Sequence, residues 1–236
     1  MRVVVRCTLV LLFAFLIFPA ALAWSGAVKG LTPEAWLARA DGAMRTLNYA
    51  GTFVYIYGDT VSTMQITHRG DAAGGVERLI SLSGPRHEVI RDHKNVESVF
   101  PDSRRVLMQQ RGDDAHFPAT LAGHINATRL AGNYVLKELG KGRVAGLQCE
   151  VISLSPRDQY RYGYTLWLDE RTGMLLRSDL LDETGKVVAR VMFTALRYPA
   201  HIPDSALKAT EIGAGFAWIR QGDREKLAPD ETGVRW

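Results

Sequence analysis

Hydrophobic and polar positions follow a helical period in the first segment of the chain that resembles part of a globular domain. Between residues 31 and 47, apolar side chains recur at spacings of three and four, which is the signature of one buried helical stripe. Thr32 is a residue type that caps helices, and Pro33 suits a first helical position. The pattern therefore predicts an amphipathic helix that packs on a sheet, with an inward stripe of Trp36, Ala40, Ala43 and Leu47.

After residue 47 the period changes to short β-rich runs that alternate with turn signals. Most connections are too short for parallel crossovers, so the sheet should be a largely antiparallel meander. About eleven strands are too many for a flat sheet, and we expect a mainly β (α+β) fold: a strongly curled, half-open barrel with the helix on its concave face. The expected strands are 49–57, 60–68, 76–82, 87–91, 96–100, 105–110, 133–139, 147–154, 162–168, 174–181 and 187–197.

Two segments give weaker patterns. Residues 111–132 are irregular, and we expect a short helix after Pro118. After residue 197 the signals fade into a linker, with one short strand around residues 216–219. We therefore divide the chain into residues 1–23, a first domain over 24–197, and 198–236 as a linker with the incomplete start of a second domain.

The first 23 residues form a secretory signal peptide by pattern. Arg2 and Arg6 give a positive start, an apolar run of 12 residues follows from Cys7 to Phe18, and small residues precede the expected cleavage after Ala23. The run is too short to cross ~30 Å of hydrocarbon. Cleavage leaves 213 residues and a periplasmic location is expected.

Charge and cysteine usage exclude several kinds of function. Losing the signal lowers the formal charge from +4 to about +2, and acids and bases are interspersed, so we expect no nucleic-acid partner. Cys149 is the single cysteine after cleavage and is expected to be a buried thiol. The histidines lack metal-ligand spacing and fit surface or strand-end positions, and no nucleophile elbow or phosphate loop occurs. We therefore expect no enzyme, no metal and no cofactor.

The densest chemical segment is SPRDQYRYGYTLWLD, residues 155–169. Arginine beside tyrosine is typical of interface anchors, and arginine also holds anionic groups. The alternative is structural: Asp158 pairs with an arginine and the tyrosines stack across strands. The predicted site for a partner or an anionic group comprises Arg157, Arg161, Tyr162 and Tyr164.

A curled sheet that one helix only partly fills leaves room for an apolar cavity. Alternation along three strands puts pairs of large apolar residues on one face each, although an ordinary core uses the same residues. The predicted cavity residues are Met64, Ile66, Leu166, Leu168, Val191 and Phe193.

Several runs of sequence resemble the RseB/MucB family of periplasmic regulators. They are GTFVYIYGDTVSTMQITHR, ERLISLSGPRHEVIRD, VFPDSRRV, FPATL, GRVAGLQCEVISLSPRDQYRYGYTLWLDERTGMLLRSDLLDETG and VMFTAL, and they extend from about residue 34 to 196. The resemblance implies a first domain like the lipoprotein carriers LolA and LolB. It also implies binding of the periplasmic part of an anti-sigma factor of the RseA or MucA type, which shields that factor from proteolysis in the sigma-E envelope stress response. Family members continue into a second domain that contributes to this binding.

Three functions remain open at this point. The first is a non-catalytic regulator whose cavity senses acyl chains of lipopolysaccharide or lipoprotein. The second is a carrier of lipid or lipoprotein of the LolA type. The third is a hydrolase with dispersed residues, which a structure without a suitable cleft would remove.

Overall fold

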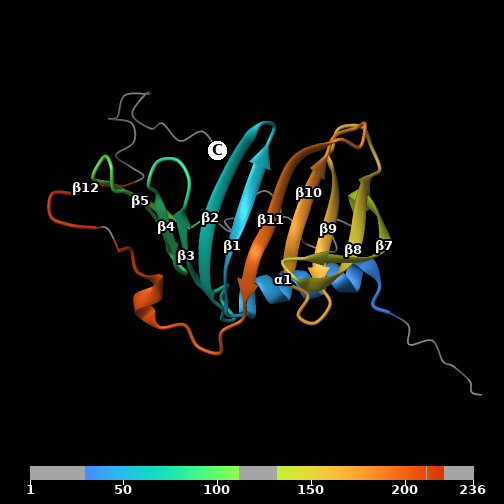
Figure 1. Cartoon of the computed structure of the whole chain (residues 1–236), viewed down its shortest axis with the longest axis horizontal. Coiled ribbons are helices and arrows are strands. Elements are labelled where there is room, and N and C mark those ends of the chain that lie inside the picture. Colours follow the sequence, from blue (N-terminus) through green and yellow to red (C-terminus); the bar gives the residue numbers. More distant parts are fainter. Residues whose placement is uncertain (1–29, 112–131, 211, 221–236) are drawn as a thin grey trace, which may run out of the picture. The chain divides into compact units, whose positions relative to one another are not determined.

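A helix and a meander of strands follow one another in the order that the sequence pattern predicts (Figure 1). The computed structural model describes residues 30–111, 132–210 and 212–220. The chain divides into two compact units, Met1–Gly30 and Leu31–Trp236, and the elements below belong to the second. The predicted signal peptide and the predicted helix after Pro118 lie outside the described residues.

The described ranges contain one α-helix, one 3-10 turn and twelve strands. They are α1 (Pro33–Thr46), β1 (Tyr49–Tyr57), β2 (Thr60–Arg69), β3 (Val76–Ser81), β4 (Glu88–Arg91), β5 (Asn95–Phe100), β6 (Arg105–Gln110), β7 (Tyr134–Val144), β8 (Leu147–Pro156), β9 (Gly163–Asp169), β10 (Leu175–Leu181), β11 (Val187–Arg197), η2 (Asp204–Leu207) and β12 (Ala217–Arg220).

All twelve described strands join one sheet, in the order β12-β6-β5-β4-β3-β2-β1-β11-β10-β9-β8-β7. Neighbouring strands are antiparallel except β12, which lies parallel to β6. β7 and β11 come into contact although three strands separate them in the sheet, so this half is strongly curled. The predicted fold class, a curled open sheet with an N-terminal helix, is confirmed.

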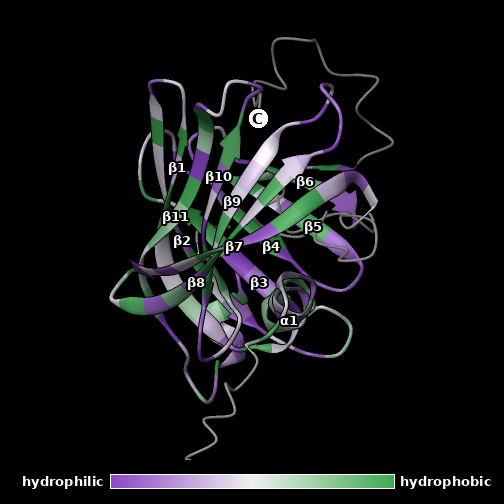
Figure 2. Ribbon diagram, turned by 90° about the vertical axis from the view of Figure 1, so that its right-hand side faces the viewer, coloured by the Kyte–Doolittle hydropathy of each residue, from purple (hydrophilic) through white to green (hydrophobic). Residues whose placement is uncertain are grey.

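The helix begins as its sequence predicts, and Trp36, Ala40 and Ala43 of the predicted stripe are buried, but Leu47 lies past the end of the helix as its extended C-cap. The Thr32 hydroxyl accepts a hydrogen bond from the Ala35 backbone N–H at 3.3 Å, and Pro33 occupies the first helical turn. Figure 2 shows α1 beside the strands. The buried face of α1 joins the sheet in one hydrophobic core, so we call the sheet face that it covers the inner face; its helical members in that core are Trp36, Leu37, Ala40 and Met44.

The opposite, outer face of β2 to β4 carries residues 202–210, which belong to the segment that the sequence pattern assigned to a linker. Ile202 and Leu207 are buried. The Thr210 hydroxyl donates to Glu88 at 2.8 Å and lies 2.9 Å from Arg78 Nη2, beside a buried Arg78–Glu88 ion pair. η2 contacts β2 and β3. Residues 202–210 are therefore packed on the sheet.

One strand is longer than predicted. The sequence pattern ends it at residue 139, because Gly140-Lys141-Gly142 resembles a turn, but β7 continues to Val144 with a bulge near Gly140. The actual turn is Ala145-Gly146, with φ of 49° and 80°. Two successive residues with positive φ match the twist of a two-residue hairpin. Alanine is unusual in that conformation, so the turn has little sequence signal.

Candidate binding site on the inner face and the adjoining loop

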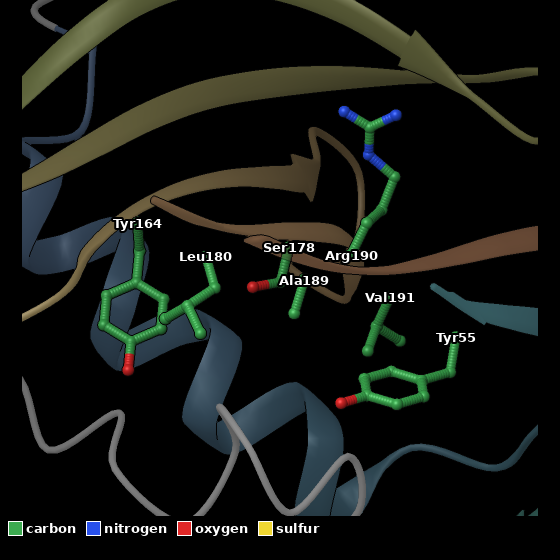
Figure 3. Close-up of a pocket in the computed structure, with 7 residues that line it drawn as sticks. All are labelled: Tyr55, Tyr164, Ser178, Leu180, Ala189, Arg190 and Val191. Atoms are coloured by element: carbon green, nitrogen blue, oxygen red, sulfur yellow. The ribbon is translucent and has the colours of Figure 1, made fainter. Parts of the chain in front are cut away.

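A pocket opens on the inner face between β1, β9, β10 and β11 (Figure 3). The space of about 230 Å³ includes open solvent, so this is a shallow open hollow that encloses far less than the ~300–1,000 Å³ of pockets for drug-sized ligands. Its lining residues are Tyr55, Tyr164, Ser178, Leu180, Ala189, Arg190 and Val191.

Strand pairing explains why these residues meet. Leu180 lies opposite Tyr164 on one side and Ala189 on the other. One residue pair further along, Val191 lies opposite both Ser178 and Tyr55. Side chains directly opposite one another in a sheet share a face, so two cross-strand rows form the pocket wall.

The pocket wall is mainly apolar, with the Ser178 hydroxyl between Leu180 and Ala189 and a tyrosine at each end (Figure 3). Burial raises the pKa of Tyr164, and Tyr134 adds to the increase; burial also raises the pKa of Tyr55. Both phenols are therefore neutral near pH 7. Figure 3 shows the Arg190 guanidinium directed away from the other side chains, and it forms an ion pair with Asp179 at 2.7 Å. The arrangement favours an apolar or weakly polar ligand group.

The structure places the six predicted cavity residues mostly in the packed core. Val191 lines the pocket, and Met64 is half-buried at the margin of the core. The other four are buried in the core cluster with the helix, and a ligand reaches them only if that packing opens; they are Ile66, Leu166, Leu168 and Phe193. A lipid cavity over all six residues stays a prediction.

The predicted arginine and tyrosine site lies on the loop between β8 and β9, residues 157–162. Arg157 and Arg161 are exposed, and the Arg161 guanidinium donates to the carboxylate of Asp158. Tyr162 is 54% exposed, whereas Tyr164 is half-buried and faces the pocket. One arginine forms the ion pair that the structural alternative predicts, and the other has no acidic partner among the described residues. Binding of a partner or an anionic group by these residues stays a prediction.

The loop and the pocket adjoin each other. The rings of Tyr134 and Tyr164 lie 6.2 Å apart between centroids. The charge of Arg161 lowers the pKa of Tyr134, although burial, the larger effect, raises it overall. Arg161 is therefore near Tyr134, whose neighbour Tyr164 lines the pocket.

Sequence reasoning missed most of the pocket. Tyr55, Leu180 and Ala189 fit the period-2 pattern of their strands, but nothing local indicates that β1 pairs with β11. It also placed His68 at a strand end near the surface. His68 does lie near the end of β2, yet it is buried and stacked on Tyr49 with ring centroids 4.6 Å apart.

The described residues contain neither a cluster of metal ligands nor a helix that could span a membrane. No three histidine, cysteine or acidic side chains lie together in a way that holds a metal ion. None of the helices found in those ranges has the length and apolar character needed to span a membrane. Cys149 is buried, and burial raises the pKa of its thiol to about 11.

The described residues form a curled sheet with one helix, a small hollow on its inner face and an exposed loop with two tyrosines and two arginines. Residues 32–211 match the family model described as MucB/RseB N-terminal domain. The chain belongs to the MucB/RseB family.

Individual relatives agree with this assignment. The AlgU regulatory protein MucB of Pseudomonas aeruginosa is 37% identical over 175 residues, which are 74% of this chain and 53% of that protein. The sigma-E factor regulatory protein RseB of Haemophilus influenzae is 30% identical over 62% of this chain and 46% of its own length. The chain thus spans about half the length of the curated relatives that it matches.

Solved structures support the same fold. MucB in the P. aeruginosa MucA/MucB complex superimposes with a TM-score of 0.62 and 35% identity, over 75% of this chain and 61% of that one. An uncharacterised conserved protein of Thermus thermophilus reaches a TM-score of 0.56 at 14% identity over 79% of this chain and 97% of its own, which shows shared fold alone.

Proposed function

We propose that this chain is a regulatory binding protein of the periplasm that binds the periplasmic part of an anti-sigma factor of the MucA or RseA type and shields it from proteolysis. Its export depends on the signal peptide, removed after Ala23. The observation that carries the proposal is the match to MucB from its complex with MucA, at 35% identity over 75% of this chain. The role requires binding without a catalytic step.

The proposed domain division rests on the sequence pattern and is supported at its far end by the family match. We place the signal peptide at residues 1–23 and begin the first domain at residue 24. The family match ends at residue 211, and residues 202–210 pack on the outer face of the sheet. Both observations support a first domain that ends nearer 211 than 197, with the start of a second domain after it.

The β8–β9 loop is the proposed contact surface. Exposed arginine and tyrosine are enriched among the residues that dominate binding energy at interfaces. Arg157, Arg161 and Tyr162 present two cations and one aromatic ring on a single short loop. Tyr164, behind them, connects this surface to the pocket.

A binding measurement with the purified protein and the periplasmic segment of MucA tests the proposal. We expect a 1:1 complex and slower cleavage of that segment by an added protease. The double variant Arg157→Ala with Arg161→Ala should bind about tenfold or more weakly while its circular dichroism is unchanged, as expected for loss of anchor residues. Arg45→Ala with Arg143→Ala removes the same charge from exposed positions outside the loop and serves as control. No binding by the wild-type protein contradicts the proposal.

The pocket supports a second candidate, an acyl-chain site that makes the protein a lipid sensor or a carrier of the LolA type. Its apolar wall of Leu180, Ala189 and Val191 is the specific observation. A sensor requires that the ligand binds the free and partner-bound forms unequally. Displacement of the MucA segment by a fatty acid favours the sensor, and transfer of a fluorescent lipid between vesicles without the segment favours the carrier.

A further inference from the structure

The β8–β9 loop contains its own counter-ion. The Arg161 guanidinium donates a hydrogen bond to Oδ2 of Asp158. The other carboxylate oxygen of Asp158 accepts the backbone N–H of Tyr160 at 3.0 Å. This second hydrogen bond closes an Asx turn, which fixes the orientation of the Asp158 carboxylate. One acid is thus held by the loop itself against one of its two arginines.

The internal ion pair is weak enough to be replaced. The side chains of Arg161 and Asp158 are 43% and 32% exposed. Partly exposed pairs between residues close in sequence favour the paired state by about fivefold at most. An external carboxylate that gains further contacts can therefore displace Asp158.

The rest of the loop is arranged to supply those further contacts. Arg157 is exposed and has no acidic partner among the described residues. Tyr160 is 85% exposed and Tyr162 is 54% exposed. The loop thus presents Arg157 without an acidic partner among the described residues, Arg161 paired with the Asp158 carboxylate, and two exposed tyrosine rings.

We propose that Asp158 is an internal substitute for a carboxylate of a protein partner. An extended acidic segment binds with one carboxylate on Arg157 and a second that displaces Asp158 from Arg161, while Tyr160 and Tyr162 cover its apolar side chains. The inference rests on the proposed function, because it specifies how the partner is recognised at the same loop. Asp158 lowers the affinity for any anion that cannot use the whole loop, and so it sets specificity.

A protein segment fits this surface better than an anionic membrane does. The neighbouring β10–β11 turn carries Asp182 and Glu183, and the β1–β2 turn carries Asp59. β9 and β10 pair up to Gly163 and Leu181, which brings the first of these turns beside the loop. A membrane with negative surface potential requires a broad basic patch. A single carboxylate requires only one local arginine.

The decisive variant is Asp158→Asn, which keeps an oxygen to accept the Tyr160 N–H but removes the charge. We expect the dissociation constant for the periplasmic MucA segment to fall roughly threefold, because the partner no longer has to break the exposed Asp158–Arg161 ion pair. Arg161→Ala should raise that constant, and Asp158→Asn should give no gain when combined with Arg161→Ala, as in a double-mutant cycle. Asp59→Asn makes the same charge change on a neighbouring turn and should leave the constant nearly unchanged.

Three outcomes overturn the inference. If Asp59→Asn raises the affinity for the MucA segment as much as Asp158→Asn does, the effect is one of general electrostatics. If Asp158→Asn still raises the affinity when Arg161 is replaced by Ala, the ion pair is irrelevant. Binding to phosphatidylglycerol vesicles that rises by the same factor assigns the loop to membranes.

Failure of the proposed function can be distinguished from failure of this inference. If the wild-type protein does not bind the MucA segment, the proposed function fails. The loop is then assessed by titrating acetate, and separately inorganic phosphate, against the side-chain N–H resonance of Arg161. Tighter acetate binding in Asp158→Asn supports the internal competitor, whereas equal binding in both proteins, or a response to phosphate alone, contradicts it.

Discussion

The two faces of the same sheet are stabilised in different ways. On the inner face, the centre is apolar: Phe53, Ile66 and Leu166 are fully buried and pack in one cluster with α1. The inner face also holds a buried ion pair, between Glu77 and Arg91 at 2.7 Å, on the same side of β3 and β4 as Leu79 and Val89. On the outer face, the central buried positions themselves include charged residues. Arg78 and Glu88 pair at 2.9 Å, and Asp179 accepts hydrogen bonds from Arg177 and Arg190.

This difference predicts which kind of substitution destabilises each face. The free energy of apolar burial is roughly proportional to the buried area. A smaller side chain at the apolar centre of the inner face therefore loses stability through the missing atoms and through the cavity that remains. Buried ion pairs contribute little net stability but cost much when one partner is removed. The apolar centre of the inner face should therefore respond to side-chain size, and the buried ion pairs of the outer face should respond to charge.

The largest effect is expected from a cavity on the inner face. Leu166 is fully buried beside Ile152 and Ser178 on the flanking strands. Leu166→Ala should lower the free energy of unfolding by about 3–4 kcal/mol, the usual cost of a large-to-small change in a core. Urea denaturation followed by circular dichroism measures it. Thr165→Ala on the outer face is the control, and a loss for Leu166→Ala below about 1 kcal/mol would contradict the comparison.

The outer face should show a charge effect that reverses when the whole network is replaced. Glu88→Gln leaves the Arg78 guanidinium buried without its counter-charge and should cost about 3 kcal/mol. The triple variant Arg78→Met, Glu88→Leu and Thr210→Val removes the three interacting side chains together, although the Thr210 backbone N–H loses its acceptor on Glu88. It should be more stable than Glu88→Gln and lie within about 2 kcal/mol of the wild type. Denaturant midpoints measure both. A triple variant less stable than Glu88→Gln shows that this face also depends on its polar contacts.

The sequence predicts most of the inner face because its signals are local. Thr32 and Pro33 mark the start of the helix, and turn residues separate strands whose bounds agree within one or two residues for most of the meander. Alternation also identifies Leu166 and Phe193 as inward-facing. It does not show whether an inward residue meets a ligand or the helix, so the predicted cavity overlaps the packed core.

The outer face was not predicted because its contacts are distant in sequence. Thr210 bonds to Glu88 across 122 residues and to Arg78 across 132, and a polar residue in a Pro-containing segment gives no signal of such docking. The candidate binding loop was predicted from its composition. The Asp158–Arg161 pair was one of two interpretations, and composition could not show that Arg157 has no acidic partner in the part of the chain that the structure describes.

The smallest effect that we expect depends on pH and tests whether charge, rather than hydrogen bonding alone, stabilises the outer face. Asp179 is buried, which pushes its pKa upward, but hydrogen bonds and charges from Arg177 and Arg190 outweigh burial and lower that pKa. Because the folded pKa lies below the unfolded value of about 3.9, the stabilisation is complete above that value and is lost as the pH falls through the folded pKa. Asp179→Asn should therefore be about 1–2 kcal/mol less stable than the wild type at pH 7, with the difference shrinking below about pH 4. Denaturation of both proteins across this range measures it, and the other acids cancel in the comparison. A difference that stays constant down to about pH 3 means that the two arginines act on Asp179 only as hydrogen-bond donors, and the charge-based account of the outer face then fails at this buried acid.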